Sequence, residues 1–136
     1  MPDRLFTPAE ANSALSDVRP VAERLVAVRA RLRELETTQR GLVHAIGGNG
    51  GGHAAGDLNA ARDEFTVLAR ELEDCARRLE DYGVLLKDPD AGLLDFPALR
   101  EGQEVLLCWR VGEEDVSYWH DFAEGFAGRK PIDWSE

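Results

Sequence analysis

The residues best suited to chemistry lie near the end of the chain, where His120, Asp121, Glu124 and Arg129 fall within ten positions. An imidazole and two carboxylates at this spacing could hold a divalent metal ion or act as general acid and base. A structural interpretation also fits, because Asp121 and Glu124 have capping-box spacing around one helical turn that Gly125 would end. We favour the structural interpretation and keep a metal site of His120, Asp121 and Glu124 as the alternative.

A second candidate site lies on one face of the predicted sheet. Alternation along the strands places five charged or aromatic side chains on this mixed face, namely Lys87, Asp95, Arg110, Trp119 and Asp121. Opposite charges beside a tryptophan suit a small anionic or polar ligand, or an interface. Ion pairing between the strands is the simpler explanation, and we expect Arg110 to take part in it.

The mixed face depends on how the strands pair. A loop at Gly112–Asp115 would set Trp109 opposite Tyr118 and Leu107 opposite His120, which makes His120 a core histidine. The other face would then pair Arg110 with Ser117, Cys108 with Trp119 and Leu106 with Asp121. In the first hairpin, a loop at Asp88–Gly92 would group the apolar residues Val84, Leu86, Leu94 and Phe96. A slip of one residue would exchange the two faces.

No motif in the sequence is diagnostic of catalysis or of a cofactor. It has no nucleophile elbow, dinucleotide fingerprint, Cys-x-x-Cys or His-Glu-x-x-His. The Gly-rich segment 47–56 follows a helix and lacks the Lys-Ser or Lys-Thr of a phosphate loop, so we interpret it as a flexible tip. Cys75 and Cys108 fit no metal-ligand spacing and are predicted to be free thiols.

Two long helices are predicted to precede the sheet. Residues 8–46 open with the capping box Thr7-Pro8-Ala9-Glu10 and keep one apolar phase through Pro20, which predicts a kinked helix. Residues 57–82 keep a heptad seam without a slip. The two should form an antiparallel, coiled-coil-like hairpin.

Four short strands are predicted in residues 84–121, joined by tight turns into a β-meander, with Pro97 ending the second. The tail 122–136 carries Phe122, Phe126, Ile132 and Trp134 and is predicted to pack as a strap over the sheet or the base of the helices. The expected fold is thus α+β and one domain, residues 1–136.

Charge limits the classes of partner. The net charge of −10 argues against nucleic acid and against an anionic membrane surface. Residues 18–46 carry six Arg against three Glu, whereas residues 57–82 carry four Arg against eight acids, so the helices complement each other. The sequence shows no signal peptide or membrane span, and we expect a soluble, cytoplasmic protein.

Several short motifs resemble a known family. They are Phe6-Thr7, Glu10-Ala11-Asn12, Gly83, Leu86-Lys87-Asp88-Pro89, Gly92-Leu93, Asp95-Phe96-Pro97, Leu107-Cys108-Trp109, Gly112-Glu113, Tyr118-Trp119-His120-Asp121, Gly125-Phe126 and Gly128-Arg129. Together they are similar to the bacterial domain-of-unknown-function family 2203 over nearly the whole chain. The resemblance implies no activity, substrate or cofactor.

Two functions remain open from the sequence. The favoured one is a non-enzymatic interaction or scaffold module that forms a homodimer, or binds a helical protein partner, through its helical hairpin. The alternative is a small-ligand or divalent-metal-dependent enzyme that uses His120, Asp121, Glu124, Arg110 and Arg129. We expect no cofactor under the favoured function.

Overall fold

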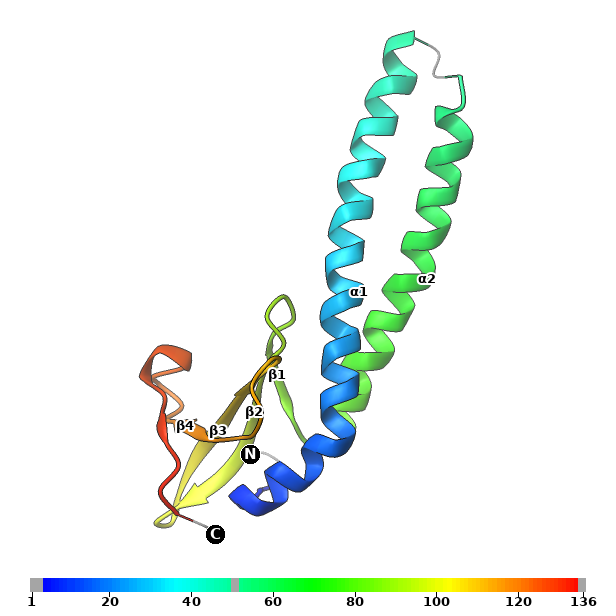
Figure 1. Ribbon diagram of the computed structural model, residues 1–136. Helices are drawn as coiled ribbons and strands as arrows, with labels where there is room; N and C mark the ends of the chain where they lie inside the picture. Colours follow the sequence, from blue (N-terminus) through cyan, green and yellow to red (C-terminus); the bar gives the residue numbers. More distant parts are fainter. Residues whose placement is uncertain (1–3, 50–51, 135–136) are drawn as a thin grey trace.

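Two long helices precede an antiparallel sheet in the structure, a computed structural model that describes residues 4–49 and 52–134 (Figure 1). The helices are α1 (Pro8–Asn49) and α2 (Ala54–Asp81). The strands are β1 (Leu85–Asp88), β2 (Leu93–Arg100), β3 (Gln103–Arg110), β4 (Tyr118–His120) and β5 (Lys130–Pro131), with a 3-10 helix, η1 (Phe126–Gly128), before the last. The predicted α+β class is confirmed. Neither described helix combines the length and apolar character needed to cross a membrane.

α1 begins as its sequence predicts. The N–H of Glu10 donates to Thr7 Oγ1 at 3.1 Å, and the N–H of Thr7 donates to Glu10 Oε1 at 2.9 Å, which completes the capping box. Pro20 lies inside the helix, and α1 changes direction within its blue N-terminal part in Figure 1. Proline removes one intrahelical hydrogen bond and crowds the preceding turn, so a bend at this place is expected.

The helices extend further into the Gly-rich segment than the predicted bounds of 8–46 and 57–82. α1 continues to Asn49 and α2 begins at Ala54, so much of the predicted tip at 47–56 is helical. A glycine in a helix costs only about 1 kcal/mol relative to alanine, and a continuing ladder of hydrogen bonds offsets that cost. Residues 50–51, in the middle of the predicted tip, lie outside the described part.

α2 ends at Asp81, one residue before the predicted bound, in a hydrogen-bonded Schellman motif. The N–H of Val84 donates to the Leu79 carbonyl at 3.1 Å, and that of Gly83 donates to the Glu80 carbonyl at 2.8 Å. Gly83 has a φ of 85°, which glycine adopts without strain. This ending turns the chain from α2 directly into β1.

α1 and α2 lie side by side and are joined by ion pairs (Figure 1). Arg24 Nε is 2.5 Å from Glu71 Oε2, and Arg31 Nε is 2.7 Å from Glu64 Oε2. Later residues of α1 thus meet earlier residues of α2, and each of these two pairs joins an arginine of α1 to a glutamate of α2. Because these pairs are exposed, they add little to stability and mainly select which helix faces meet.

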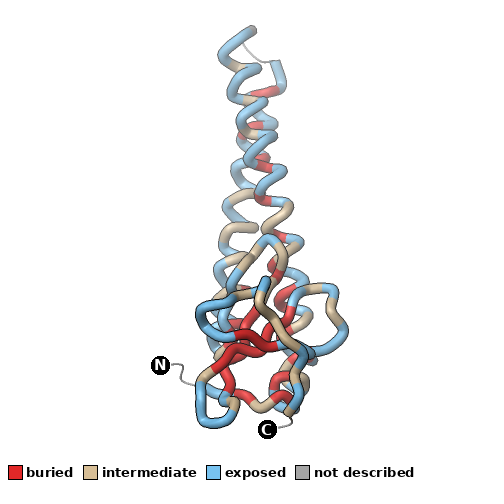
Figure 2. The backbone as a smooth tube through the Cα atoms, turned by 90° about the vertical axis from the view of Figure 1, so that its left-hand side faces the viewer, coloured by how far each residue is buried: buried red, intermediate tan, exposed pale blue. Residues whose placement is uncertain are grey.

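The apolar seam between the helices is only partly enclosed. Its fully buried members in the distal half of the pair are Val28, Leu32, Leu35, Ala54, Leu58 and Ala61. Five others are half-buried: Leu42, Ile46, Phe65, Leu68 and Leu72. Buried and exposed positions alternate along both helices in Figure 2. We call these five half-buried residues the uncovered seam.

The sheet has five strands, whereas four were predicted. They follow the order β1-β2-β3-β4-β5 with every pair antiparallel, which is a meander. The fifth strand is the Lys130–Pro131 segment of the predicted strap, which pairs with Tyr118 and Trp119. A strand of two residues is too short to show an alternation of polar and apolar side chains, and for that reason the sequence did not reveal it.

Pro97 does not end the second strand, contrary to prediction. β2 continues to Arg100, and Pro97 pairs with Leu106 of β3. The Pro97 carbonyl accepts a hydrogen bond from the N–H of Phe6 at 2.7 Å. The N–H and C=O of a strand residue point to the same side, which for Pro97 is the side away from β3. Proline therefore costs β2 no hydrogen bond to β3, and the strand can continue.

The predicted register is correct in the first hairpin and wrong between β3 and β4. Leu86 pairs with Leu94 and Leu85 with Asp95, as expected, before a bulge at Asp88. In contrast, β4 is shifted by one residue: the observed pairs are Leu106 with His120, Leu107 with Trp119, and Cys108 with Tyr118. Each side chain of β4 therefore lies on the opposite face from the one predicted.

A contact with α1 explains the shift. Val116 is buried, and its N–H donates to Asn12 Oδ1 at 2.8 Å while its carbonyl accepts from Asn12 Nδ2 at 3.1 Å. Val116 is thus held against the helix and does not pair with Val111. The connection from β3 to β4 becomes a wide loop, 111–117, in place of the predicted tight turn.

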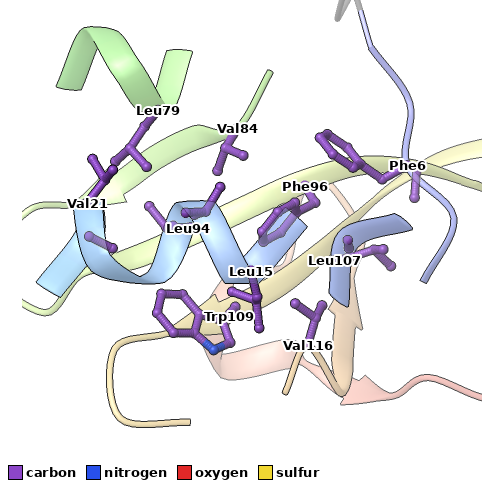
Figure 3. Close-up of a cluster of buried hydrophobic side chains, with 14 of the residues drawn as sticks. Phe6, Leu15, Val21, Leu79, Val84, Leu94, Phe96, Leu107, Trp109 and Val116 are labelled. Carbon is purple, nitrogen blue, oxygen red and sulfur yellow. The ribbon is translucent and has the colours of Figure 1, made fainter. Parts of the chain in front are cut away.

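The hydrophobic core lies between α1, the end of α2 and one face of the sheet (Figure 3). Leu94, Phe96, Leu107 and Trp109 project from β2 and β3 towards the helices and are fully buried. Phe6 packs edge-on against Phe96, with ring centroids 5.2 Å apart. Trp119 faces the same core and packs edge-on against Trp134 of the strap, with ring centroids 5.7 Å apart. This core positions the central strands, whose other face carries the polar side chains.

Candidate functional site

Three chemically capable side chains meet on the sheet face away from the helices. Asp95, Cys108 and His120 come from the neighbouring strands β2, β3 and β4. Asp95 pairs with Cys108 directly, and His120 pairs with Leu106, two residues from Cys108. One donor atom from each lies within 4.8 Å of the donors of the other two, and all three residues are buried. We call them the buried triad.

His120 is fixed at both ring nitrogens. Nδ1 is 2.7 Å from the Asp121 carbonyl oxygen, which can only accept, so Nδ1 carries a hydrogen. Nε2 is 3.0 Å from Asp95 Oδ1, and the side chains of His120 and Asp95 are only 4% and 2% exposed. One proton is therefore shared between Nε2 and the carboxyl oxygen. Burial raises the pKa of Asp95 above its ordinary value, against the opposing effects of His120 and Lys87.

Cys108 is unsuited to act as a nucleophile in this arrangement. Burial, and then the charge of Asp95, raise the pKa of its thiol to about 12. A reactive cysteine needs a thiolate near neutral pH and contact with solvent, and Cys108 is fully buried. The Cys, His and Asp of the triad therefore do not work as a protease-like nucleophile and base.

An arginine closes the site from the C-terminal side. Arg129 binds Glu113 through two nitrogens at 2.9 Å each, and Nη2 also donates to the Cys108 carbonyl at 3.3 Å. Its guanidinium stacks on Tyr118 and Phe126, 4.2 and 4.4 Å from the ring centroids. Glu113, which sequence reasoning had not selected, thus ties the β3–β4 loop to the segment that follows β4.

The predicted metal ligands do not converge. The His120 ring points to Asp95 and Cys108, whereas Asp121 is exposed. Glu124 Oε1 pairs with Lys130 Nζ at 2.6 Å and lies 3.4 Å from the Asp121 N–H, which is one half of the predicted capping box. His120 is a buried histidine as predicted, but on the opposite sheet face. The site of His120, Asp121 and Glu124 is therefore not present as such.

The predicted mixed face is also only partly correct. Asp95 and Arg110 share it, but Trp119 lies on the helix-facing side because of the shift in β4. Lys87 and Arg110 are exposed. Over residues 4–49 and 52–134, the Arg110 guanidinium makes no ion pair, so the expected pairing between strands is wrong.

Arg110→Ala is expected to change the free energy of unfolding by no more than about 0.5 kcal/mol, as for other exposed side chains without partners. Urea denaturation of the variant beside the parent measures this change. Arg129→Ala is the comparison, because Arg129 is 14% exposed and paired with Glu113, and it should cost clearly more. Equal losses in the two variants would contradict the assignment.

The sequence did hold one signal for the buried triad. Residues 105–109, Val-Leu-Leu-Cys-Trp, are apolar without alternation, which is typical of a strand buried on both faces. β3 is in fact buried on both faces over this run. A second covered face means that Asp95, opposite Cys108, must be buried too.

Residues 4–132 match the protein family described as "Uncharacterized conserved protein (DUF2203)". The matched range contains both helices, all five strands and the buried triad. No curated protein and no solved structure matches the chain.

Proposed function

The chain belongs to the DUF2203 family of uncharacterised conserved proteins, and from its two helices we propose that it is a non-enzymatic interaction module that forms a homodimer. The observation that carries the proposal is the uncovered seam, formed by Leu42, Ile46, Phe65, Leu68 and Leu72. These large apolar side chains are only partly buried, along a helix pair whose other faces are strongly charged.

A second copy is the occupant that this surface fits best. Two helices enclose a seam only from two sides, whereas four helices surround it, as in a four-helix bundle. Val43, which adjoins Leu42, and Val67, which adjoins Leu68, are 51% and 65% exposed and would gain cover in such a bundle. The helix pair would then act as a coiled-coil-like hairpin, with the sheets at its ends.

Charge supports the same partner. Residues 18–46 of α1 have a net charge of +3 (six Arg, three Glu), and residues 57–82 of α2 have one of −4 (four Arg, eight acids). Glu64 and Glu71 pair with α1 of the same chain, which leaves most α2 carboxylates available. α1 of one copy placed beside α2 of the other would be attractive in both directions of a two-fold contact.

The same charge argues against other classes of partner. A net charge of −10 repels nucleic acid and anionic lipid, so we exclude both from the proposed function. The buried free thiols Cys75 and Cys108 fit a reducing compartment, and we place the dimer in the bacterial cytoplasm.

The alternative of an enzyme on the polar residues of the sheet has weaker support. Asp121 and Glu124 are exposed and do not join His120, and Arg110 is separate from both. Leu93, Arg110 and Phe126 border a shallow surface pocket of about 320 Å³ that contains no member of the buried triad. Asp88 also lines this pocket, but its carboxylate accepts hydrogen bonds from the N–H groups of Asp90 and Ala91 and caps the turn between β1 and β2.

The mass of the purified chain in solution tests the proposal. Sedimentation equilibrium should give twice the 15.0 kDa of one chain. Val43→Glu places a charge beside the uncovered seam at a position already exposed, so it should weaken the dimer at least about tenfold without unfolding the chain. Leu99→Glu, at a 44% exposed position of β2, is the matched control and should leave the mass unchanged. A parent chain that stays monomeric at about 100 μM would refute the proposed function, because such an interface reaches μM affinity.

A further inference from the structure

We propose that the buried triad of Asp95, Cys108 and His120 is a binding site for one zinc ion. The proposal goes beyond the interaction function and does not depend on it. It rests on the donor types, their distances, the orientation of the imidazole and the balance of buried charge.

The donors have the types that zinc binds. The triad offers one nitrogen, one carboxylate oxygen and one sulfur, and zinc accepts all three types in a tetrahedral shell. Magnesium and calcium require oxygen donors throughout, so this set favours zinc over either of them. The fourth position would be left for water, which is usual for zinc sites with three protein ligands.

The distances require only small movements. Nε2 and Oδ1 are 3.0 Å apart, and no pair of donors in the triad is more than 4.8 Å apart. Zinc bonds of about 2.0–2.3 Å in a tetrahedron place neighbouring donors about 3.3–3.6 Å apart. Rotation of the Cys108 and Asp95 side chains, which extend from directly paired residues, can supply this change.

The imidazole is already oriented as a ligand. Nδ1–H donates to the Asp121 carbonyl at 2.7 Å, so the lone pair of Nε2 is the one directed at Asp95 and the centre of the triad. A hydrogen bond from the second ring nitrogen to a carbonyl is the usual support of a histidine that binds zinc. The Arg129 guanidinium is occupied by Glu113 and by the Cys108 carbonyl, so it does not compete for the Cys108 sulfur.

Zinc would leave the buried charge unchanged. Without metal, the site holds one proton between Asp95 and His120 and one on the Cys108 thiol, so it is neutral. Zn²⁺ would replace these two protons, and its two charges would be cancelled by one carboxylate and one thiolate. A neutral site in both states avoids the cost of burying net charge. The ion would also tie β2, β3 and β4 together.

Zinc binding by the metal-free, full-length chain tests the proposal. Titration against a chromophoric chelator should show one tight equivalent of Zn²⁺ per chain. Co²⁺ in its place should give visible bands of tetrahedral cobalt and a near-ultraviolet thiolate-to-cobalt band. Cys108→Ser should abolish the thiolate band and lower the affinity for zinc at least about 100-fold. Loss of a residue that only hydrogen-bonds to a zinc ligand already lowers metal affinity about 10–100-fold. Cys75→Ser is the matched control, because Cys75 is the other buried free thiol and lies in α2. That variant should bind both metals like the parent.

X-ray absorption of the zinc-loaded parent keeps the proposal testable if Cys108→Ser does not fold. One sulfur at about 2.3 Å, with nitrogen and oxygen at about 2.0 Å, is the expected first shell. A folded parent that takes up no zinc, a shell without sulfur, or a thiolate band that survives in Cys108→Ser would each overturn the assignment.

Discussion

Leu79→Ala should lower the free energy of unfolding by about 2–5 kcal/mol, the range for truncating a leucine in a packed core. Leu79 is 0% exposed and lies where the end of α2 meets α1 and the sheet, close to Val21 and Val84 (Figure 3). Its carbonyl also accepts the bond that ends α2. The cavity would thus open where three elements meet and where little can collapse to fill it. Urea denaturation followed by circular dichroism measures the loss.

Leu72→Ala is the control for this variant. Leu72 belongs to the same seam, two turns earlier, but it is only half-buried. A half-buried leucine removes less apolar area from water on folding, and its truncation leaves no closed cavity. The loss should therefore be smaller, about 1–2 kcal/mol. Equal losses of unfolding free energy in the two variants would contradict the assignment of Leu79 as fully buried and Leu72 as half-buried.

His120→Ala should cost the metal-free chain about 3–5 kcal/mol, the usual loss when one partner of a buried pair is removed. Asp95 is 1% exposed and its Oδ1 faces the histidine, so the variant leaves a buried carboxyl without its partner. The Asp121 carbonyl would lose its donor as well. The measurement is the denaturation midpoint in the presence of a chelator, which separates the pair from any contribution of bound zinc.

His44→Ala provides the matched control, because His44 lies on the exposed surface of α1. It should stay within about 0.5 kcal/mol of the parent. A similarly small loss for His120→Ala would mean that the buried pair adds no net stability, and that solvent or neighbouring groups replace the lost partner.

The helices were predictable because their signals are local. The capping box of Thr7 and Glu10 and the glycine ending after Tyr82 depend on residues a few positions apart, and both occur as expected. The helix ends within the Gly-rich segment were missed because glycine lowers helix propensity without forbidding it. The opposite charges of the two helices can be counted along the sequence without knowledge of the fold, and two of these arginines lie beside glutamates of the other helix.

The buried triad was not predictable in this way, because its register is set by a distant contact. Asn12 binds both backbone groups of Val116, and this contact shifts β4 by one residue relative to a tight-turn pairing. That shift brings His120 to Asp95 and sends Trp119 to the core. Neither the turn residues at 112–115 nor the alternation of β4 contains information about Asn12. The register of β4 could therefore be assigned to the exact residue only with knowledge of the tertiary structure.

The same contact bears on how the molecule is made. Asn12 and Val116 are 104 residues apart, and Phe6 meets Pro97 across a similar span. A ribosome that adds about 5–20 residues per second needs roughly 5–20 s to make that length of chain. During this time Leu15 and Val18 have no sheet to cover them, although the rest of α1 can already pair with α2 once that helix has emerged. The turns of α1 that precede the bend at Pro20 therefore dock last.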